Sequence, residues 1–319
     1  MNRDQFVHQN EPTWQRTENL LGRLESRRRF EHELAELPEL YRRCCHHLAL
    51  ARQRHYDTPL EERLNRIALR GYHQLYRQRR FSPAAVLRFV AVGFPRLVRA
   101  HASLFWLATV LFYGPGIAMG LLVLDDPDSI YSLLSAEEVQ QFEDMYRSTR
   151  TEERAATTDF SMFGFYIFHN ISIAFRTFAS GLLAGVGTIF FLVFNGLFLG
   201  AVFAHLVHAG VAQNLLVFVV AHGALELTAL VIAGVAGLRL GAAVVAPGRL
   251  PRSEALRQAA RVGVQLILGA AVMLAAAAFV EAYWSSTASV TPTGKLAVGA
   301  VAWIVVTAYL ALGGKRRGS

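Results

Sequence analysis

Cysteine is scarce in this sequence: there are only two, Cys44 and Cys45, and they are adjacent. Neighbouring cysteines seldom meet the geometry of a disulfide bond, so we expect none. His46 and His47 follow directly, which could suggest a metal site. However, four consecutive residues on a helix point all around it and cannot meet one ion. Cys44 also fits the apolar spacing of its helix, so we expect core packing here, with histidines on the surface.

Charge is also scarce over a long part of the chain. Residues 160–245 carry almost no charged side chain, whereas residues 1–100 are rich in them, and the whole sequence is 53% hydrophobic and 18% charged. Two such regimes in one chain predict a soluble head and a membrane body. The first eleven residues are polar and lack the apolar region of a cleavable signal peptide. The predicted fold class is therefore all-α: a polytopic helical membrane protein with an N-terminal cytoplasmic helical domain.

Apolar runs predict about six transmembrane helices, each about the length needed to cross the hydrocarbon core. Three of them are plain, at residues 103–124, 262–283 and 296–312. The 85 residues from 161 to 245 suit three more, at roughly 162–185, 188–209 and 214–243. One crossing with re-entrant segments would also satisfy the topology of this stretch.

Loop charges predict the orientation. Residues 1–100 hold 19 Arg against 11 acidic residues, whereas residues 125–160 hold 3 Arg against 10. The loop 246–261 and the C-terminal tail are basic. Because basic loops stay on the cytoplasmic side, we expect both termini in the cytoplasm and an acidic extracytoplasmic loop at 125–160. The net charge of +8 follows this topology, so it predicts no nucleic-acid binding.

The predicted domains are a head at residues 1–100 and a transmembrane domain at 101–319. Within the head we expect helices beginning near Pro12, near Pro38 and at Thr58, where Thr, Pro and Glu form a start signal. Residues 83–100 alternate apolar and arginine side chains. They could form an interfacial helix on the inner membrane surface, or a bundle helix with a solvated basic face.

Small residues recur at a spacing of four in the membrane body, and such rows let transmembrane helices approach closely. Helix packing alone explains most rows of this kind, so a row by itself predicts no function. The glycines that we expect at helix contacts are Gly181, Gly185, Gly196, Gly200, Gly223, Gly237 and Gly241.

The most informative pair in the apolar region is His222 and Glu226, which share one helix face. Ionisable residues at membrane depth cost roughly 2.5–3.5 kcal/mol on insertion scales, so they face protein or water. Asn195, Arg176 and Asn170 join them in a predicted intramembrane polar site. Arg176 could be the countercharge of Glu226, Asn195 could bond across helices, and His222 could relay protons. The plainer interpretation is that these side chains only lock helix packing.

A metal site is a minor alternative at this pair. Histidine and glutamate four residues apart could supply two zinc ligands, with a third from His205, His208 or His169. His205 and His208 are otherwise expected at the membrane interface, and Glu281 in water at the outer end of the fifth span. With no other metal or cofactor motif in the sequence, we expect no bound metal and no cofactor.

The stretch from Asn170 to Gly241 carries a resemblance. It contains Gly181 to Thr188, an Asn-Gly-x-x-x-Gly element at 195–200, a His-Gly-x-x-Glu element at 222–226, and Gly237 to Gly241. In these it resembles the stage II sporulation protein M family, also called DUF95. The helices of the head also look like those of long-headed family members. One departure is His169-Asn170, where many relatives have paired asparagines.

The resemblance implies a role in membrane assembly or linked to transport, with no established catalytic activity. The family's namesake acts as a membrane scaffold with peptidoglycan-degrading partners. Relatives often lie beside genes for MoxR-type ATPases and RDD-type membrane proteins, which are therefore candidate partners.

We accordingly expect a non-enzymatic scaffold or assembly partner in the bacterial inner membrane. In this interpretation the chain forms a homo-oligomer and joins an envelope or ATPase-linked complex in the lipid bilayer. The alternative is a channel or transporter whose pathway uses Asn195, His222, Glu226 and Arg176.

Overall fold

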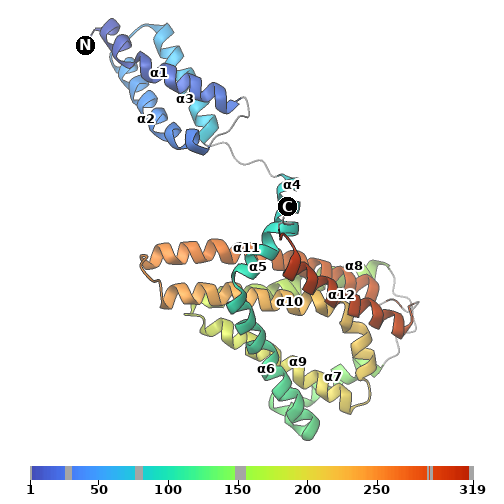
Figure 1. The fold of residues 1–319 in the computed structure, drawn as a ribbon. Coiled ribbons are helices and arrows are strands. Elements are labelled where there is room, and N and C mark those ends of the chain that lie inside the picture. The colour runs from blue at the N-terminus through green and yellow to red at the C-terminus, as the bar shows by residue number, and fades with distance from the viewer. Residues whose placement is uncertain are drawn as a thin grey trace. The chain divides into compact units, whose positions relative to one another are not determined.

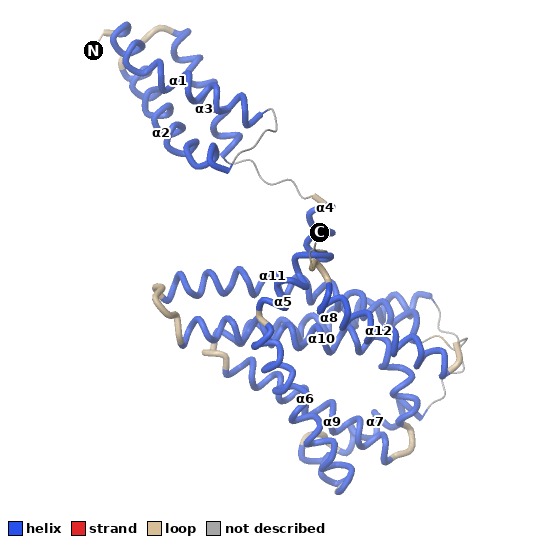
Figure 2. Tube along the Cα trace, viewed as in Figure 1, coloured by secondary structure: helices blue, strands red, loops and turns tan. Residues whose placement is uncertain are grey.

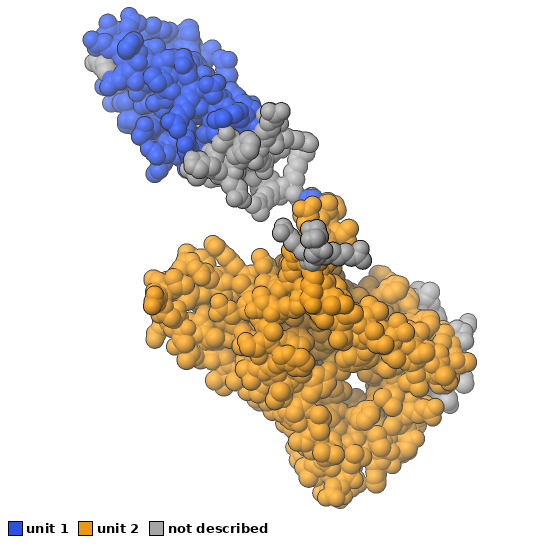
Figure 3. Space-filling view, in the orientation of Figure 1, with its two compact units in different colours: residues 1–82 blue, residues 83–319 orange. Residues whose placement is uncertain are grey.

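The computed structural model describes residues 2–25, 31–75, 82–147, 156–285, 287 and 290–315. Within these ranges the chain is helical and contains no strand (Figure 2). It divides into two compact units, residues 1–82 and residues 83–319 (Figure 3). The all-α polytopic fold class is thus confirmed, and each unit has its own hydrophobic core.

The first unit, which we call the head, is a bundle of three helices: α1 (Arg3–Glu25), α2 (Glu31–Gln53) and α3 (Thr58–Leu75) (Figure 1). Its core is built around Trp14, Phe6 and Leu64, which are at most 1% exposed. Cys44 is fully buried in this core, and its sulfur lies 3.5 Å from the hydroxyl of Thr17. Both cysteines are free.

Two of the three predicted helix starts are wrong. α1 begins at Arg3 and α2 at Glu31, so Pro12 and Pro38 lie inside helices. A proline inside a helix removes one backbone hydrogen bond, and burial of the apolar face compensates here. Thr58 does begin α3.

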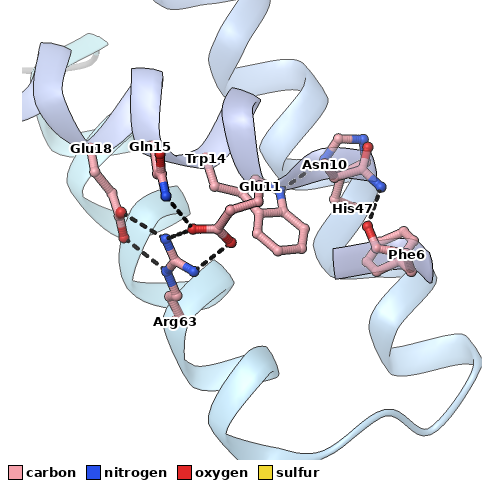
Figure 4. Close-up of polar contacts among 8 residues, drawn as sticks. All are labelled: Phe6, Asn10, Glu11, Trp14, Gln15, Glu18, His47 and Arg63. Carbon is pink, nitrogen blue, oxygen red and sulfur yellow. Dashed lines mark hydrogen bonds and ion pairs between the residues drawn. The ribbon is translucent and has the colours of Figure 1, made fainter. Parts of the chain in front are cut away.

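The centre of the bundle holds a polar contact that the sequence did not indicate (Figure 4). The indole N–H of Trp14 donates to Nδ1 of His47 over 3.0 Å. His47 is therefore partly buried, not the surface residue we expected. Burial, followed by repulsion from His46 and Arg43, lowers its pKa from the ordinary value of 6.5.

Arg63 of α3 binds side chains of α1 at the edge of this core (Figure 4). Its guanidinium donates to Glu11 over 2.8 Å and to Glu18 over 3.0 Å, and it lies 5.8 Å from the ring centre of Trp14. The hydrogen bond from Arg63 lowers the pKa of Glu11. Three helices are thus tied together by one aromatic ring and one arginine.

The second unit, the membrane unit, contains α4 (Pro83–Arg88), η1 (Phe89–Gly93), α5 (Phe94–Ala100) and α6 (Ala102–Asp125). After α6 come η2 (Pro127–Ser132) and α7 (Ala136–Arg147), then α8 (Ala156–Ala179) and η3 (Ser180–Leu182). The chain continues with α9 (Val186–His208), α10 (Ala212–Val245), α11 (Arg252–Phe279), η4 (Val280–Ser285) and α12 (Pro292–Leu312).

Among the described residues, five helices are long and apolar enough to cross a membrane. They are α6, α9, α10, α11 with η4, and α12. The expected span at 162–185 corresponds to α8, whose His169, Asn170 and Arg176 lower its mean hydropathy. A multi-pass membrane protein is therefore shown, and α8 as a sixth crossing stays a prediction.

α10 is the central helix of the membrane unit. It contacts α11, α12, α8, α9 and α6, while α6 packs along α9 (Figure 1). Its residues from Ala229 to Leu238 are all buried, because neighbouring helices cover every face. A helix that is apolar all round fits such a position.

Residues 83–100 belong to the membrane unit, although the predicted head included them. Phe94 and Val98 of α5 are buried in the core of the membrane unit. Arg99 donates to the backbone oxygens of Leu310 and Gly313, and so caps the end of α12. Arg99 is therefore not part of a freely solvated basic face, whereas Arg88 is exposed and α4 has no buried residue.

Candidate functional site

The predicted pair lies in the first half of α10, which packs on η4 at this level. The side chain of His222 is 4% exposed and that of Glu226 is 29% exposed. Nε2 of His222 lies 4.0 Å from Oε2 of Glu226, as a separation of four residues on a helix dictates. One face of α10 therefore presents an imidazole and a carboxylate together.

Glu226 opens onto a cavity of about 380 Å³. Asn170 of α8, Asn195 of α9 and Glu226 of α10 all line it, so the structure brings these three predicted residues to one space. His169 also lines this cavity, its ring stacked on that of Phe165 at 5.6 Å. Residues of α7 contribute to the wall as well. We call this space the polar cavity.

Glu281 also lines the polar cavity, which corrects our expectation that it is solvated. It is only 8% exposed. It lies in η4, a π-helical turn that follows α11 directly and packs on α10. Sequence reasoning missed Glu281 because its position at the end of an apolar run suggested an emerging helix.

A buried polar shell supports His222 from the other side. Nδ1 of His222 lies 3.1 Å from the hydroxyl oxygen of Ser285, which is itself buried. Nζ of Lys295, on α12, donates to the backbone oxygen of Ser285 over 2.7 Å. Lys295 is 8% exposed, so an amino group is held inside the protein close to the site. Neither Ser285 nor Lys295 had been predicted as a site residue.

Arg176 does not lie at the polar cavity. Its side chain is exposed in the last turn of α8, so the structure offers no contact in which it would be the countercharge of Glu226. A cation in the last turn of a helix interacts favourably with the helix dipole, which explains its position without the site.

Asn195 makes a local hydrogen bond, not the predicted bond across helices. Its amide donates to the backbone oxygen of Phe191, four residues earlier on α9, over 2.7 Å. Asn195 is half-buried and lines the cavity. Asn170, 7% exposed, faces the same space from α8.

Of the three histidines considered as a third metal ligand, His169 lines the polar cavity, whereas His205 and His208 lie away from it. Nε2 of His205 is 2.8 Å from a carboxylate oxygen of Glu143 on α7, and His208 is exposed. His205 is therefore a buried partner of α7, where we expected an interfacial residue. The third ligand-type side chain near His222 and Glu226 is instead that of Glu281.

Most of the glycines that we predicted at helix contacts lie close to the backbone of a neighbouring segment. An added Cβ at Gly196 would lie 2.0 Å from the backbone oxygen of Phe112, which brings α9 against α6. At Gly181 it would lie 2.2 Å from the oxygen of Gly237, and at Gly241 2.4 Å from the Cα of Gly185. Gly185 adopts a φ of 84°, which favours glycine. These contacts fix the turn before α9 on α10.

Gly223 differs from the other predicted packing glycines. An added Cβ there would meet only side chains of its own helix, the nearest being Val219 at 3.2 Å. Gly223 instead lines a second cavity of about 430 Å³ between α6, α9 and α10, whose walls are apolar. The membrane unit thus contains an apolar and a polar cavity, and Leu227 of α10 lines both of them.

Comparisons with known proteins agree with this division of the chain. Residues 108–286 match the family model described as stage II sporulation protein M. Residues 4–77 match a model described as a domain of unknown function, DUF8413. No curated protein and no solved structure matches the chain. The first match contains every residue that lines the polar cavity.

Proposed function

Because the chain belongs to the stage II sporulation protein M family, we propose that it is a non-enzymatic scaffold of a membrane complex. In this proposal the membrane unit assembles as an oligomer in the bacterial inner membrane. The head binds partners of an envelope or ATPase-linked complex, for which MoxR-type ATPases and RDD-type membrane proteins are candidates.

The self-contained head is the observation that supports this function. Its core residues come from α1, α2 and α3 alone, so the bundle needs no side chain of the membrane unit. Arginine and glutamate side chains cover much of its outside, as in the pair of Arg70 with Glu25 at 2.9 Å. A soluble domain that folds by itself is suited to binding a partner beside the membrane.

Deleting residues 2–82 tests the scaffold. Affinity-tagged full-length and head-deleted proteins are recovered from native membranes, and the co-purifying proteins are compared by quantitative mass spectrometry. We expect the head-deleted protein to insert and to lose specific partners. Unchanged partner recovery would contradict the proposal. Arg66→Gln, on the exposed face of α3, is a control that changes the surface of the head and keeps its fold. It should recover the same partners as the full-length protein.

A channel or transporter is the second candidate function, and the polar cavity favours it. Carboxylates and amides that gather inside an apolar bundle are typical of a pathway for ions or polar solutes. Here α8, α9, α10 and η4 each contribute one such side chain. Glu226 is the residue best placed to contact a solute, since it is partly exposed to the cavity.

Flux measurements in liposomes distinguish the two functions. The purified protein is reconstituted, and proton and monovalent-cation flux are followed with fluorescent indicators. A pathway through the cavity predicts flux that Glu226→Gln abolishes and that His205→Gln, outside the cavity, leaves unchanged. Absence of flux, or equal flux in Glu226→Gln, would argue against a pathway.

A further inference from the structure

Three ligand-type side chains lie close together at the polar cavity, and two of them, Glu226 and Glu281, line it. One ligand atom each from His222, Glu226 and Glu281 lies within 4.8 Å of the other two. They come from two parts of the chain, α10 and η4, that the fold packs together. One imidazole and two carboxylates form a donor set that first-row divalent metal ions accept.

The spacing leaves room for an ion between the three groups. Metal–nitrogen and metal–oxygen bonds to Zn²⁺ measure about 2.0–2.2 Å, so two ligand atoms on one ion lie at most about 4.4 Å apart. The largest separation here is within 4.8 Å, and the His222–Glu226 separation is 4.0 Å. Small changes in the side-chain torsions of the two carboxylates would close the remaining gap.

Ser285 orients the histidine for this role. Nδ1 of His222 lies 3.1 Å from the Ser285 hydroxyl, and Nε2 faces Glu226. Metal-binding histidines almost always use one ring nitrogen for the ion and the other for such a partner. Ser285 is in turn held by Lys295, which donates to its backbone oxygen. The supporting hydrogen bonds of a metal site are therefore in place around His222.

Burial and access are both suited to an ion. His222 is 3% exposed and Glu281 is 8% exposed, so their ligand atoms are sheltered from bulk water. Glu226 and Glu281 line the polar cavity, which gives a route to the site and space for water or a solute ligand. Asn170 and Asn195 also line this cavity.

We propose that His222, Glu226 and Glu281 bind one divalent first-row metal ion, Zn²⁺ or Mn²⁺. The ion would join α10 to the end of α11 and leave coordination positions open toward the polar cavity. This site is independent of the proposed scaffold function, since a scaffold and a transporter could both contain it.

Equilibrium dialysis of the full-length protein tests the site. Protein purified in detergent is stripped with a chelator and dialysed against ZnCl₂ or MnCl₂, and bound metal is measured by mass spectrometry. We expect one ion per chain for at least one metal. Glu281→Gln and His222→Gln should each weaken binding by at least 100-fold. Ser285→Ala should weaken it by about 10- to 100-fold, because it removes only the orienting contact.

His205→Gln is the matched control, since His205 is also a buried histidine beside a glutamate, Glu143. It should leave binding unchanged. X-ray absorption of the wild-type protein supplies a measurement that needs no variant: nitrogen and oxygen neighbours without sulfur separate this site from Cys44 and Cys45. The proposal would be overturned if neither metal bound stoichiometrically, or if the bound metal had sulfur neighbours. It would also be overturned if Glu281→Gln, eluting from size exclusion as the wild type does, bound the metal with wild-type affinity.

Discussion

Gly200 of α9 lies directly against the backbone of Gly116 of α6. A Cβ added at Gly200 would be 1.9 Å from the Gly116 backbone oxygen, nearer than any real Cβ contact. Because the obstacle is backbone, rotation of a side chain cannot relieve it. The crossing of α6 and α9 therefore depends on the absence of two side chains.

Gly200→Ala should destabilise the membrane unit by about 1–3 kcal/mol, the usual range for overpacking. The measurement is thermal unfolding of the purified protein in detergent. Gly164→Ala on α8 is the control, because an added Cβ there meets nothing within 4 Å. Equal midpoints for the two variants would show that α6 and α9 do not cross at these glycines.

Arg99→Gln should loosen the end of α12. Its guanidinium donates to the oxygens of Leu310 and Gly313, and hydrogen bonds from charged groups contribute about 1.5–3 kcal/mol. Hydrogen exchange measured by mass spectrometry should accelerate about tenfold or more in the last turn of α12. Arg88→Gln on α4, whose side chain is exposed, should not change it. Unchanged exchange in Arg99→Gln would contradict this capping role.

Arg63→Gln should lower the stability of the head by about 1–2 kcal/mol, from two ion pairs and one cation–π contact. Because the head has its own core, we expect residues 1–82 alone to unfold cooperatively in urea, followed by circular dichroism. Arg66→Gln, exposed on the same helix, is the matched control. Similar midpoints for both variants would mean that the contacts of Arg63 contribute nothing.

The head should lose stability as the pH falls below about 6.5, the ordinary pKa of histidine. Burial lowers the pKa of His47 in the folded state, so the unfolded chain takes up the proton first. Protonated Nδ1 also cannot accept the indole hydrogen of Trp14. Urea unfolding of residues 1–82 at about pH 7 and about pH 5 measures the loss.

Two variants identify the residue responsible for this pH dependence. His47→Gln should reduce the difference between the two pH values, whereas His46→Gln, exposed one residue earlier, should keep it. If His47→Gln keeps the full difference, another group causes it.

The orientation stays a prediction and can be measured by cysteine labelling. In a background with Cys44→Ser and Cys45→Ser, Asp128→Cys should react with a membrane-impermeant maleimide added outside intact cells. Arg249→Cys should react only after permeabilisation, because basic loops remain inside. The reverse result would invert the topology. Labelling of both sites from outside would require a different number of crossings between residues 128 and 249.

The long apolar helices could be read from the sequence because each is longer than about 20 residues and lacks strong interruptions. The predicted spans at 103–124 and 296–312 fall within α6 and α12. Within the polar site, the His222–Glu226 pair follows from helix spacing alone. Predicting that these two side chains share a face required no information about any other helix.

The parts that could not be predicted depend on tertiary contacts. Nothing local distinguishes Pro12 inside a helix from a proline that begins one, because the difference lies in what the helix buries. Arg176 seemed a natural partner for Glu226, yet the rotation of α8 that leaves it exposed is set by packing. Likewise, η4 with Glu281 and Ser285, and α12 with Lys295, reach the site around His222 of α10 only through tertiary packing.

The π turn at Val280–Ser285 means that residue identity alone does not define this site. A π turn holds one residue more than a regular turn, which rotates the following side chains by about 100°. In a relative that lacked the additional residue, a serine aligned with Ser285, at the end of the turn, would point in another direction. A sequence alignment would then give the aligned residue the same role. Whether that residue reaches His222 depends instead on the number of residues in the turn.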